Sequence, residues 1–154
     1  MAATHVQRSA LLPYAQADLF AMVADVRAYP SFLPWCEAVE VLSESAEVVE
    51  ARVSAKAAGV SQSFVTRNHM HAHSSIELSL VEGPFEQFAG RWDFTSLGDE
   101  SVTGCKLALD MRFELARKNP ILRRTFGALF ERASTTLVES FCERAKVLFD
   151  GAAS

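Results

Sequence analysis

The last third of the chain carries a helical pattern that follows a long stretch of strand-like sequence. From Asn119 to about Phe149, apolar residues recur at spacings of three and four, namely Leu122, Phe126, Leu129, Phe130, Ala133, Leu137, Phe141, Ala145 and Leu148. Asn119 suits the N-cap, and Pro120 suits the first helical position, where its missing N–H costs nothing. The resulting helix is roughly 45 Å long. No other part of the chain predicts a long helix, so this helix must pack along a sheet that curves to wrap it.

The segment after Cys36 alternates apolar and polar residues, which predicts about six half-buried strands. Short turns between consecutive strands indicate an antiparallel meander. Before this meander we expect a strand over Thr4–Leu12, a helix over Ala15–Asp25 and a short helical turn over Ala28–Leu33. The predicted fold class is therefore α+β.

Composition limits the classes of protein that remain. The 154 residues suit one domain, which we place at residues 1–150, with a short tail at 151–154. The net charge of −4 argues against a general nucleic-acid binder but not against a local basic patch. The three cysteines Cys36, Cys105 and Cys142 have no metal-ligand spacing, which favours buried free thiols in a reducing compartment. Without a secretory signal or a spanning segment, we expect a cytoplasmic protein.

Small residues on the predicted strands indicate unfilled volume beneath the long helix. Ala51, Ala55 and Ala57 share one strand face, and Gly90 interrupts another strand, where we expect a bulge or bend. Ligand sites are concave and mostly apolar, so this pattern predicts a ligand cavity. Ordinary interdigitation of a dense core is the alternative interpretation.

Four segments carry motifs that are specific in combination: Val26–Cys36 (VRAYPSFLPWC), Phe64–Asn68 (FVTRN), Leu80–Phe94 (LVEGPFEQFAGRWDF) and Cys105–Leu115 (CKLALDMRFEL). They resemble the bacterial RatA and coenzyme-Q-binding family, within the START-like (polyketide-cyclase-like) helix-grip superfamily. The resemblance covers nearly the whole chain. It implies a seven-stranded antiparallel sheet curved around the C-terminal helix, with a lipid-sized tunnel between them.

The resemblance implies two kinds of function. Members of the bacterial RatA type are described as toxins that associate with the large ribosomal subunit and block its joining to the small subunit. Mitochondrial-type members are thought to bind ubiquinone and support respiration. The chain lacks a mitochondrial targeting extension, so a non-enzymatic RatA-type protein is the first hypothesis, and an antitoxin partner stays open. The alternative is a carrier or chaperone for a polyprenyl quinone or another lipid, with no required cofactor. A cyclase-like enzyme is a third, weaker hypothesis.

The predicted ligand cavity is lined by residues from the proline-rich segment, the strands and the long helix: Tyr29, Phe32, Leu33, Trp35, Phe64, Thr66, Asn68, Leu78, Phe85, Trp92, Phe94, Leu109, Met111, Phe126, Phe130 and Leu137. Partial exposure of Trp35 would favour a cavity lip, and full burial a packed connector. Phe85 is either a lid residue or a core plug. Thr66 and Asn68 face inward and must each be hydrogen-bonded, either to a quinone carbonyl or to backbone and trapped water.

Other motifs give weaker signals. His69, His71 and His73 alternate, and a three-residue turn would place His69 opposite Glu77. We therefore expect a cross-strand ion pair on the solvent side and no metal site. No serine or cysteine has the surroundings of a nucleophile, so no catalytic residue is predicted.

A basic cluster lies around the start of the predicted long helix, with no acidic residue between Glu114 and Glu131: it consists of Arg117, Lys118, Arg123 and Arg124. On an acidic protein, such a patch suits the phosphates of ribosomal RNA. The alternative is a solvated helix start, although the helix dipole disfavours positive charge there.

Overall fold

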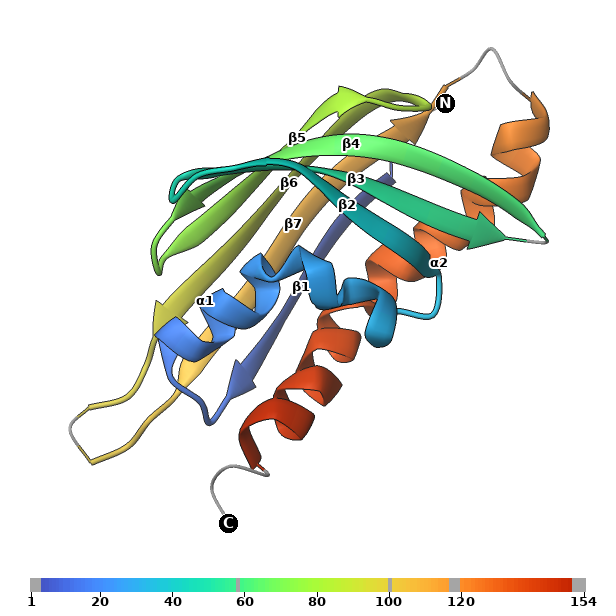
Figure 1. The fold of residues 1–154 in the computed structure, drawn as a ribbon. Helices are drawn as coiled ribbons and strands as arrows, with labels where there is room; N and C mark the ends of the chain where they lie inside the picture. The colour runs from blue at the N-terminus through green and yellow to red at the C-terminus, as the bar shows by residue number, and fades with distance from the viewer. Residues whose placement is uncertain (1–3, 58, 100, 117–119, 151–154) are drawn as a thin grey trace.

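The structure is a computed structural model that describes residues 4–57, 59–99, 101–116 and 120–150. One antiparallel sheet of seven strands curves around the long helix α2 (Pro120–Ala145), as Figure 1 shows. The strands run in the order β1-β7-β6-β5-β4-β3-β2 across the sheet. Their bounds are β1 Thr4–Leu12, β2 Cys36–Glu44, β3 Val48–Ala57, β4 Val60–His71, β5 Ser75–Glu82, β6 Phe85–Ser96 and β7 Cys105–Leu115.

Two short helices connect β1 to β2. Helix α1 (Gln16–Ala24) buries Leu19, Phe20, Met22 and Val23. The following turn, η1 (Val26–Ser31), is a 3-10 helix that contains Pro30, and it packs against β2. The predicted elements are thus confirmed, although η1 begins at Val26 rather than Ala28 and ends before Leu33.

Helix α2 closes the hollow side of the sheet. Its described part begins at Pro120, and the predicted N-cap Asn119 lies outside the described residues. The α-helix ends at Ala145, and a short π-helical turn, η2 (Lys146–Asp150), continues to the end of the predicted helix. No helix among the described residues is long and apolar enough to cross a membrane.

Strand β7 shows how the sequence pattern becomes a core. Its alternate residues Cys105, Leu107, Leu109, Met111, Phe113 and Leu115 are buried, whereas Lys106, Asp110 and Arg112 are exposed. Because side chains alternate between the two faces of a strand, the apolar set faces inward as one row. Phe126, Phe130 and Phe141 of α2 bury their rings in the same hydrophobic core.

Gly90 has a different role from the one predicted. It pairs in regular register with Leu78 on β5 and Met111 on β7, so it marks no bulge. A Cβ atom at this position would lie 3.1 Å from Leu78 Cδ1, which shows that the glycine makes room for this neighbour. The register shifts instead between β2 and β3, between β4 and β5, and near Phe85 between β6 and β7. Bulges of this kind bend strands, so they account for part of the curvature.

The turn before β6 contains the predicted glycine. Gly83 has a φ of +153°, and a Cβ atom there would lie 2.6 Å from Phe64 Cβ. A glycine is therefore needed both for the backbone conformation and for the close approach to β4.

The three cysteines are free thiols, and Cys36 and Cys105 are buried as predicted. Cys142 is only partly buried, because it lies toward the edge of the α2 interface. Burial raises the pKa of the Cys36 thiol to about 11 and also raises the pKa of the other two. All three thiols therefore stay protonated near neutral pH.

Phe141 joins three parts of the fold, and its removal tests how strongly α2 is held. Its side chain is 0% exposed, and its ring contacts Tyr29 at 5.5 Å, Phe32 at 5.3 Å and Trp92 at 5.2 Å between centroids. We expect Phe141→Ala to lower the free energy of unfolding by about 3–5 kcal/mol in urea titrations, because it leaves a cavity. Val147→Ala, at a 70% exposed position, should change it by less than about 0.5 kcal/mol. Equal effects would contradict this account of the core.

Candidate functional site

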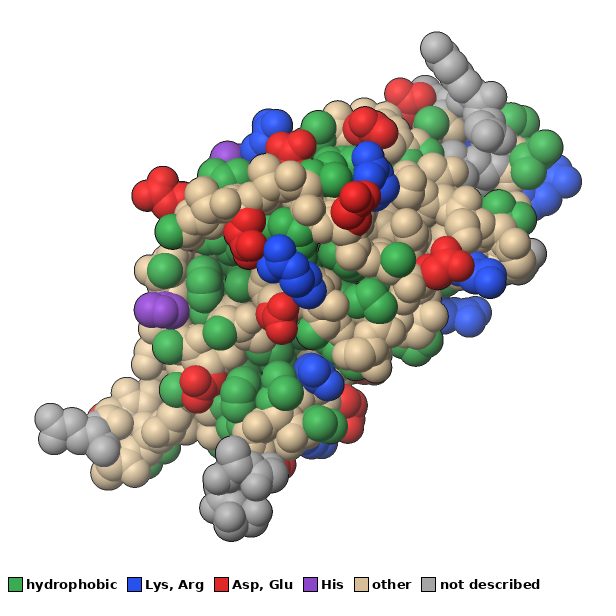
Figure 2. All heavy atoms as spheres, viewed as in Figure 1, with side chains coloured by type: hydrophobic (Ala, Val, Ile, Leu, Met, Phe, Trp, Pro, Cys, Tyr) green, Lys and Arg blue, Asp and Glu red, His purple; other side chains and the backbone are tan. Residues whose placement is uncertain are grey.

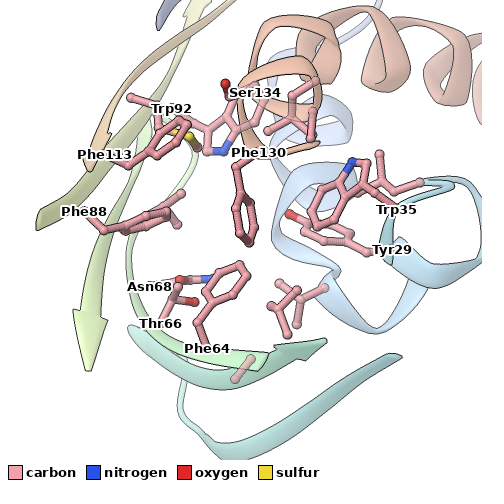
Figure 3. A pocket seen from close by; sticks show the side chains of 18 of the residues that line it. Tyr29, Trp35, Phe64, Thr66, Asn68, Phe88, Trp92, Phe113, Phe130 and Ser134 are labelled. Atoms are coloured by element: carbon pink, nitrogen blue, oxygen red, sulfur yellow. The ribbon is translucent and has the colours of Figure 1, made fainter. Parts of the chain in front are cut away.

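A cavity of about 100 Å³ lies between the concave face of the sheet, η1 and α2 (Figure 3). Its lining is mostly aromatic and aliphatic and comes from nearly every layer of the fold: Val26, Tyr29, Leu33, Trp35, Ala51, Val53, Phe64, Thr66, Asn68, Leu78, Phe85, Phe88, Trp92, Met111, Phe113, Phe130, Ala133, Ser134, Leu137 and Phe141. No Asp, Glu, His, Lys or Arg is among these lining residues. The site is therefore suited to a neutral, largely apolar ligand.

Two groups of rings frame the cavity. The Phe130 cluster consists of Phe64, Phe85, Phe88, Phe113 and Phe130, with ring centroids 5.2–6.4 Å apart in the contacting pairs. The Phe141 cluster consists of Tyr29, Phe32, Trp92 and Phe141, with centroids 5.2–6.0 Å apart. Most of these pairs meet edge to face, which is a favourable geometry for aromatic rings. The rings thus form stable walls.

Twelve of the sixteen predicted residues line this cavity: Tyr29, Leu33, Trp35, Phe64, Thr66, Asn68, Leu78, Phe85, Trp92, Met111, Phe130 and Leu137. Their role in ligand binding stays a prediction. The structure places the other four elsewhere. Phe94 packs against Phe20 of α1, Phe126 packs beside Phe130, Leu109 is buried in the surrounding core, and Phe32 lies under Arg144.

Eight lining residues were missed: Val26, Ala51, Val53, Phe88, Phe113, Ala133, Ser134 and Phe141. Periodicity contained a signal for several of them. Phe113 follows Met111 by two on one strand face, and Ala133 and Phe141 flank Leu137 by four on the helix. Ala51 was interpreted as a small residue that leaves volume unfilled, and in the structure it lines the cavity.

Tyr29 and Trp35 stand on the η1 side of the cavity, across Phe130 from Thr66 and Asn68 (Figure 3). Trp35 is partly exposed, the arrangement that favours a cavity lip over a packed connector. The Tyr29 hydroxyl donates a hydrogen bond to the Val23 carbonyl. Burial raises the pKa of Tyr29 well above its usual value, so this phenol stays protonated. Tyr29 is therefore not available as a base, because its hydroxyl stays protonated and already donates to the backbone.

Three polar side chains interrupt the apolar lining. Thr66 and Asn68 on β4 and Ser134 on α2 are each 5–6% exposed. The Ser134 hydroxyl donates to the Glu131 carbonyl at 2.9 Å. The Asn68 side-chain oxygen is buried, and no described residue donates a hydrogen bond to it. Among the described residues, the backbone partner predicted for this side chain is therefore absent at the oxygen, and pairing with a ligand or a trapped water stays a prediction.

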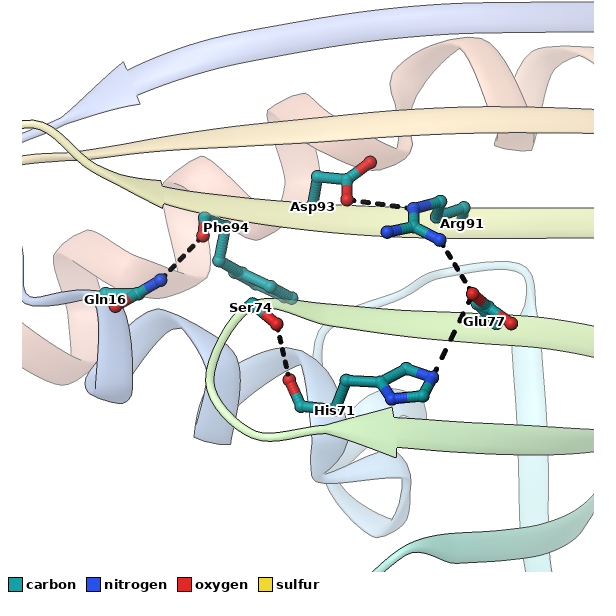
Figure 4. Close-up of polar contacts among 7 residues, drawn as sticks. All are labelled: Gln16, His71, Ser74, Glu77, Arg91, Asp93 and Phe94. Atoms are coloured by element: carbon teal, nitrogen blue, oxygen red, sulfur yellow. Dashed lines mark hydrogen bonds and ion pairs between the residues drawn. The ribbon is translucent and has the colours of Figure 1, made fainter.

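The histidines lie on the outer side of the sheet and at its turn. His69 and Glu77 are register partners as predicted, but the expected ion pair between them is wrong. Glu77 instead contacts Arg91 at 2.7 Å and His71 at 3.9 Å, as Figure 4 shows. His73 lies in the turn, where its ring contacts Phe20. Among the described residues, no three His, Cys, Asp or Glu side chains are grouped to hold a metal ion.

Some arginines form ion pairs with carboxylates, whereas those near the start of α2 form none with the described residues. On the outer face of the sheet and its margin, Arg27, Arg52, Arg67 and Arg91 each form an ion pair with a glutamate. Figure 2 shows acidic and basic side chains interspersed on the viewed face. Arg124 on α2 is exposed and Arg123 is partly exposed, and neither makes a salt bridge with the described part of the chain. Arg117 and Lys118 lie outside the described residues.

A further arginine belongs to the same helix. Arg132 is exposed two turns beyond Arg124 and was missed because it follows the acidic Glu131. Exposed ion pairs neutralise charge locally, whereas these arginines of α2 have no carboxylate partner among the described residues and are available to an external anion.

Sequence and structure comparisons agree with this architecture. The family model described as polyketide cyclase / dehydrase and lipid transport matches residues 12–142. The ribosome association toxin RatA of Pseudomonas aeruginosa is 45% identical over 146 residues, covering 95% of this chain and 98% of the relative. The chain therefore belongs to the polyketide cyclase / dehydrase and lipid transport family, and within it to the group of RatA proteins.

Solved structures share the fold. The Zhui aromatase/cyclase from Streptomyces sp. R1128 has a TM-score of 0.77 at 19% identity, covering 94% of this chain and 96% of that one. A START superfamily protein from Mycobacterium smegmatis has a TM-score of 0.71 at 20% identity, covering 94% and 98%. The START-like helix-grip fold is thereby confirmed, and at these identities the likeness concerns the fold alone.

Asn68 provides a test of whether the cavity is built for stability. An unpaired buried acceptor keeps its desolvation penalty, so we expect Asn68→Leu to raise the free energy of unfolding by about 1 kcal/mol. The variant should show a higher midpoint in urea titrations followed by tryptophan fluorescence. A loss of stability of similar size would show instead that the amide is a satisfied part of the core.

Proposed function

We propose that this chain is a ribosome-association protein that binds the large ribosomal subunit and hinders its joining to the small subunit. Binding to rRNA phosphates would proceed through Arg123, Arg124 and neighbouring positions of α2. Such a protein works in the cytoplasm and acts by binding rather than by catalysis.

The observation that carries this proposal is the extent of the similarity to the RatA proteins. Identity of 45% runs over nearly the full length of both chains, whereas the cyclase neighbour shares 19%. A fold hosts many functions, so the relative at higher identity is the better guide.

Charge supports the same proposal. The net charge is −4, yet Arg123 and Arg124 have no carboxylate partner among the described residues. Binding to nucleic-acid backbones depends on local arginine and lysine contacts rather than on the net charge. The first turns of α2, which carry these two arginines, are therefore a suitable contact surface for rRNA phosphates despite the net negative charge of the chain.

A binding role also suits the chemistry of the cavity. Tyr29 is the only ordinary proton-transfer group among its described lining residues, and its hydroxyl is already bonded to backbone. General acid–base catalysis needs a group with a pKa near the working pH, whereas burial moves the pKa of Tyr29 in the opposite direction.

The arginine contact is tested by charge reversal. We expect Arg123→Glu/Arg124→Glu to weaken co-sedimentation with purified large subunits by at least about tenfold at moderate salt, and to lower the salt slope of log K by about two. The matched control is Arg8→Glu/Lys106→Glu, the same charge change at exposed positions on β1 and β7. If both double variants bind like the original protein, α2 is not the contact surface.

A second candidate function follows from the cavity itself, which is the binding of an apolar ligand such as a polyprenyl quinone or another lipid. It is supported by the aromatic lining and by the partly exposed Trp35, past which a ligand tail can extend. An interior of about 100 Å³ holds a head group rather than a whole lipid, so the tail would lie along the opening.

Filling the cavity separates this second function from the first. Ala133 lines the cavity and Ala128 is exposed on the same helix. We expect native mass spectrometry of gently purified protein to show a bound lipid that Ala133→Leu removes and Ala128→Leu retains. Ribosome co-sedimentation should be unchanged in both variants, and thermal unfolding checks that each is folded. A lipid that persists in Ala133→Leu would lie outside the cavity.

A further inference from the structure

Asn68 occupies an unusual position for an amide. It lies on β4 between Val49 of β3 and Leu78 of β5, in the middle strands of the concave face. Its side chain lines the cavity and is 5% exposed, and its oxygen lacks a donor among the described residues. An apolar residue would suit the surrounding core better, so the amide imposes a cost that the fold itself does not require.

The missing partner of this amide has a definite chemistry. The side-chain oxygen only accepts hydrogen bonds, so its partner must be an O–H or N–H group. A carbonyl or ether on a ligand can pair with the amide nitrogen but leaves the oxygen unpaired. A hydroxyl both donates and accepts, and it therefore pairs with the amide in either orientation. Thr66, two residues along the same strand face, supplies a second hydroxyl about 7 Å away along the strand.

The cavity also limits the shape and charge of the group that reaches Asn68. Its volume of about 100 Å³ is below the roughly 150 Å³ of an apolar protein cavity that holds one benzene ring, so it admits at most one ring, with the rest of the ligand in the opening. The surrounding phenylalanines contact one another edge to face, a packing that a flat aromatic ring can join. None of the described lining residues is charged, so an ionised ligand would lose its hydration without compensation.

From these constraints we infer that the cavity selects a neutral, single aromatic ring that carries a hydroxyl group, with the hydroxyl hydrogen-bonded to Asn68. Phenols and hydroquinones belong to this class, whereas quinones and ketones offer only acceptors, so a quinone ligand of the kind proposed above would fit in its reduced, hydroquinone form. This inference rests on the proposed ligand-binding function of the cavity and names the class of head group that the site accepts.

The class is tested with three probes of similar size and different polarity: 4-ethylphenol donates and accepts, acetophenone only accepts, and ethylbenzene does neither. Isothermal titration calorimetry with the full chain measures each affinity directly, without ribosomes. We expect 4-ethylphenol to bind about tenfold more tightly than acetophenone, because only the phenol satisfies the buried oxygen. The Ala133→Leu variant should lose binding of all three probes, which locates them in the cavity.

Two isosteric variants assign the preference to one residue. Asn68→Leu should bind 4-ethylphenol no more tightly than ethylbenzene, whereas Thr66→Val should keep the preference for the phenol. Each substitution replaces a polar side chain by an apolar one of similar volume, and urea titrations verify that the variants fold.

The possible results of these titrations test separate parts of the proposal. If acetophenone or ethylbenzene binds the original protein as tightly as the phenol, the cavity takes ligands but the hydroxyl class is wrong. If Thr66→Val rather than Asn68→Leu loses the preference, Thr66 recognises the hydroxyl and the role assigned to Asn68 is wrong. If no probe binds, both the inference and the ligand-binding function fall, and the ribosome proposal is untouched.

Discussion

The burial of one aromatic stripe of α2 is the interaction on which the rest of this fold depends. Phe126, Phe130 and Phe141 are nearly inaccessible, and only the concave face of the sheet can cover rings of this size. A flat sheet would contact a long helix along a single line, whereas a bent sheet surrounds it. The bulges near the ends of β2, β5 and β6 therefore serve the same burial as the apolar pattern of the helix.

The same geometry produces the cavity. Ala51 on β3 and Ala133 on α2 both line it, and their short side chains leave volume that larger residues would fill. The fold tolerates alanine at positions 51 and 133 because the Phe130 and Phe141 clusters supply the packing contacts of the core. The cavity is consequently a property of side-chain size at a few positions, and larger residues there would close it without changing the topology.

Periodicity was sufficient to predict the elements, because faces of strands and helices are local properties. The strand Thr4–Leu12 has the predicted bounds, and the C-terminal helix lies where its apolar spacing placed it. Periodicity could not tell where along a face the hollow lies. Phe94 faces inward as its neighbours do, but α1 covers that end of the sheet. Its ring therefore packs against Phe20 of α1 instead of lining the cavity. The ion pairs of Glu77 could not be predicted from the sequence either. Arg91 on the neighbouring strand β6 contacts Glu77 and competes with the histidines of β4.

Asn68 shows where a local sequence argument ends. Buried amides are hydrogen-bonded as a rule, so the sequence predicted a partner for Asn68, either a quinone carbonyl or backbone and trapped water. No described residue donates to the oxygen, although Asn68 is paired with Val49 on β3 and with Leu78 on β5 and its side chain lines the cavity. This unpaired oxygen is the observation behind the proposal that a ligand enters the cavity. On the same helix that closes this cavity, Arg124 and Arg132 face solvent, so the inner and outer faces of α2 can serve two different ligands and be altered one at a time.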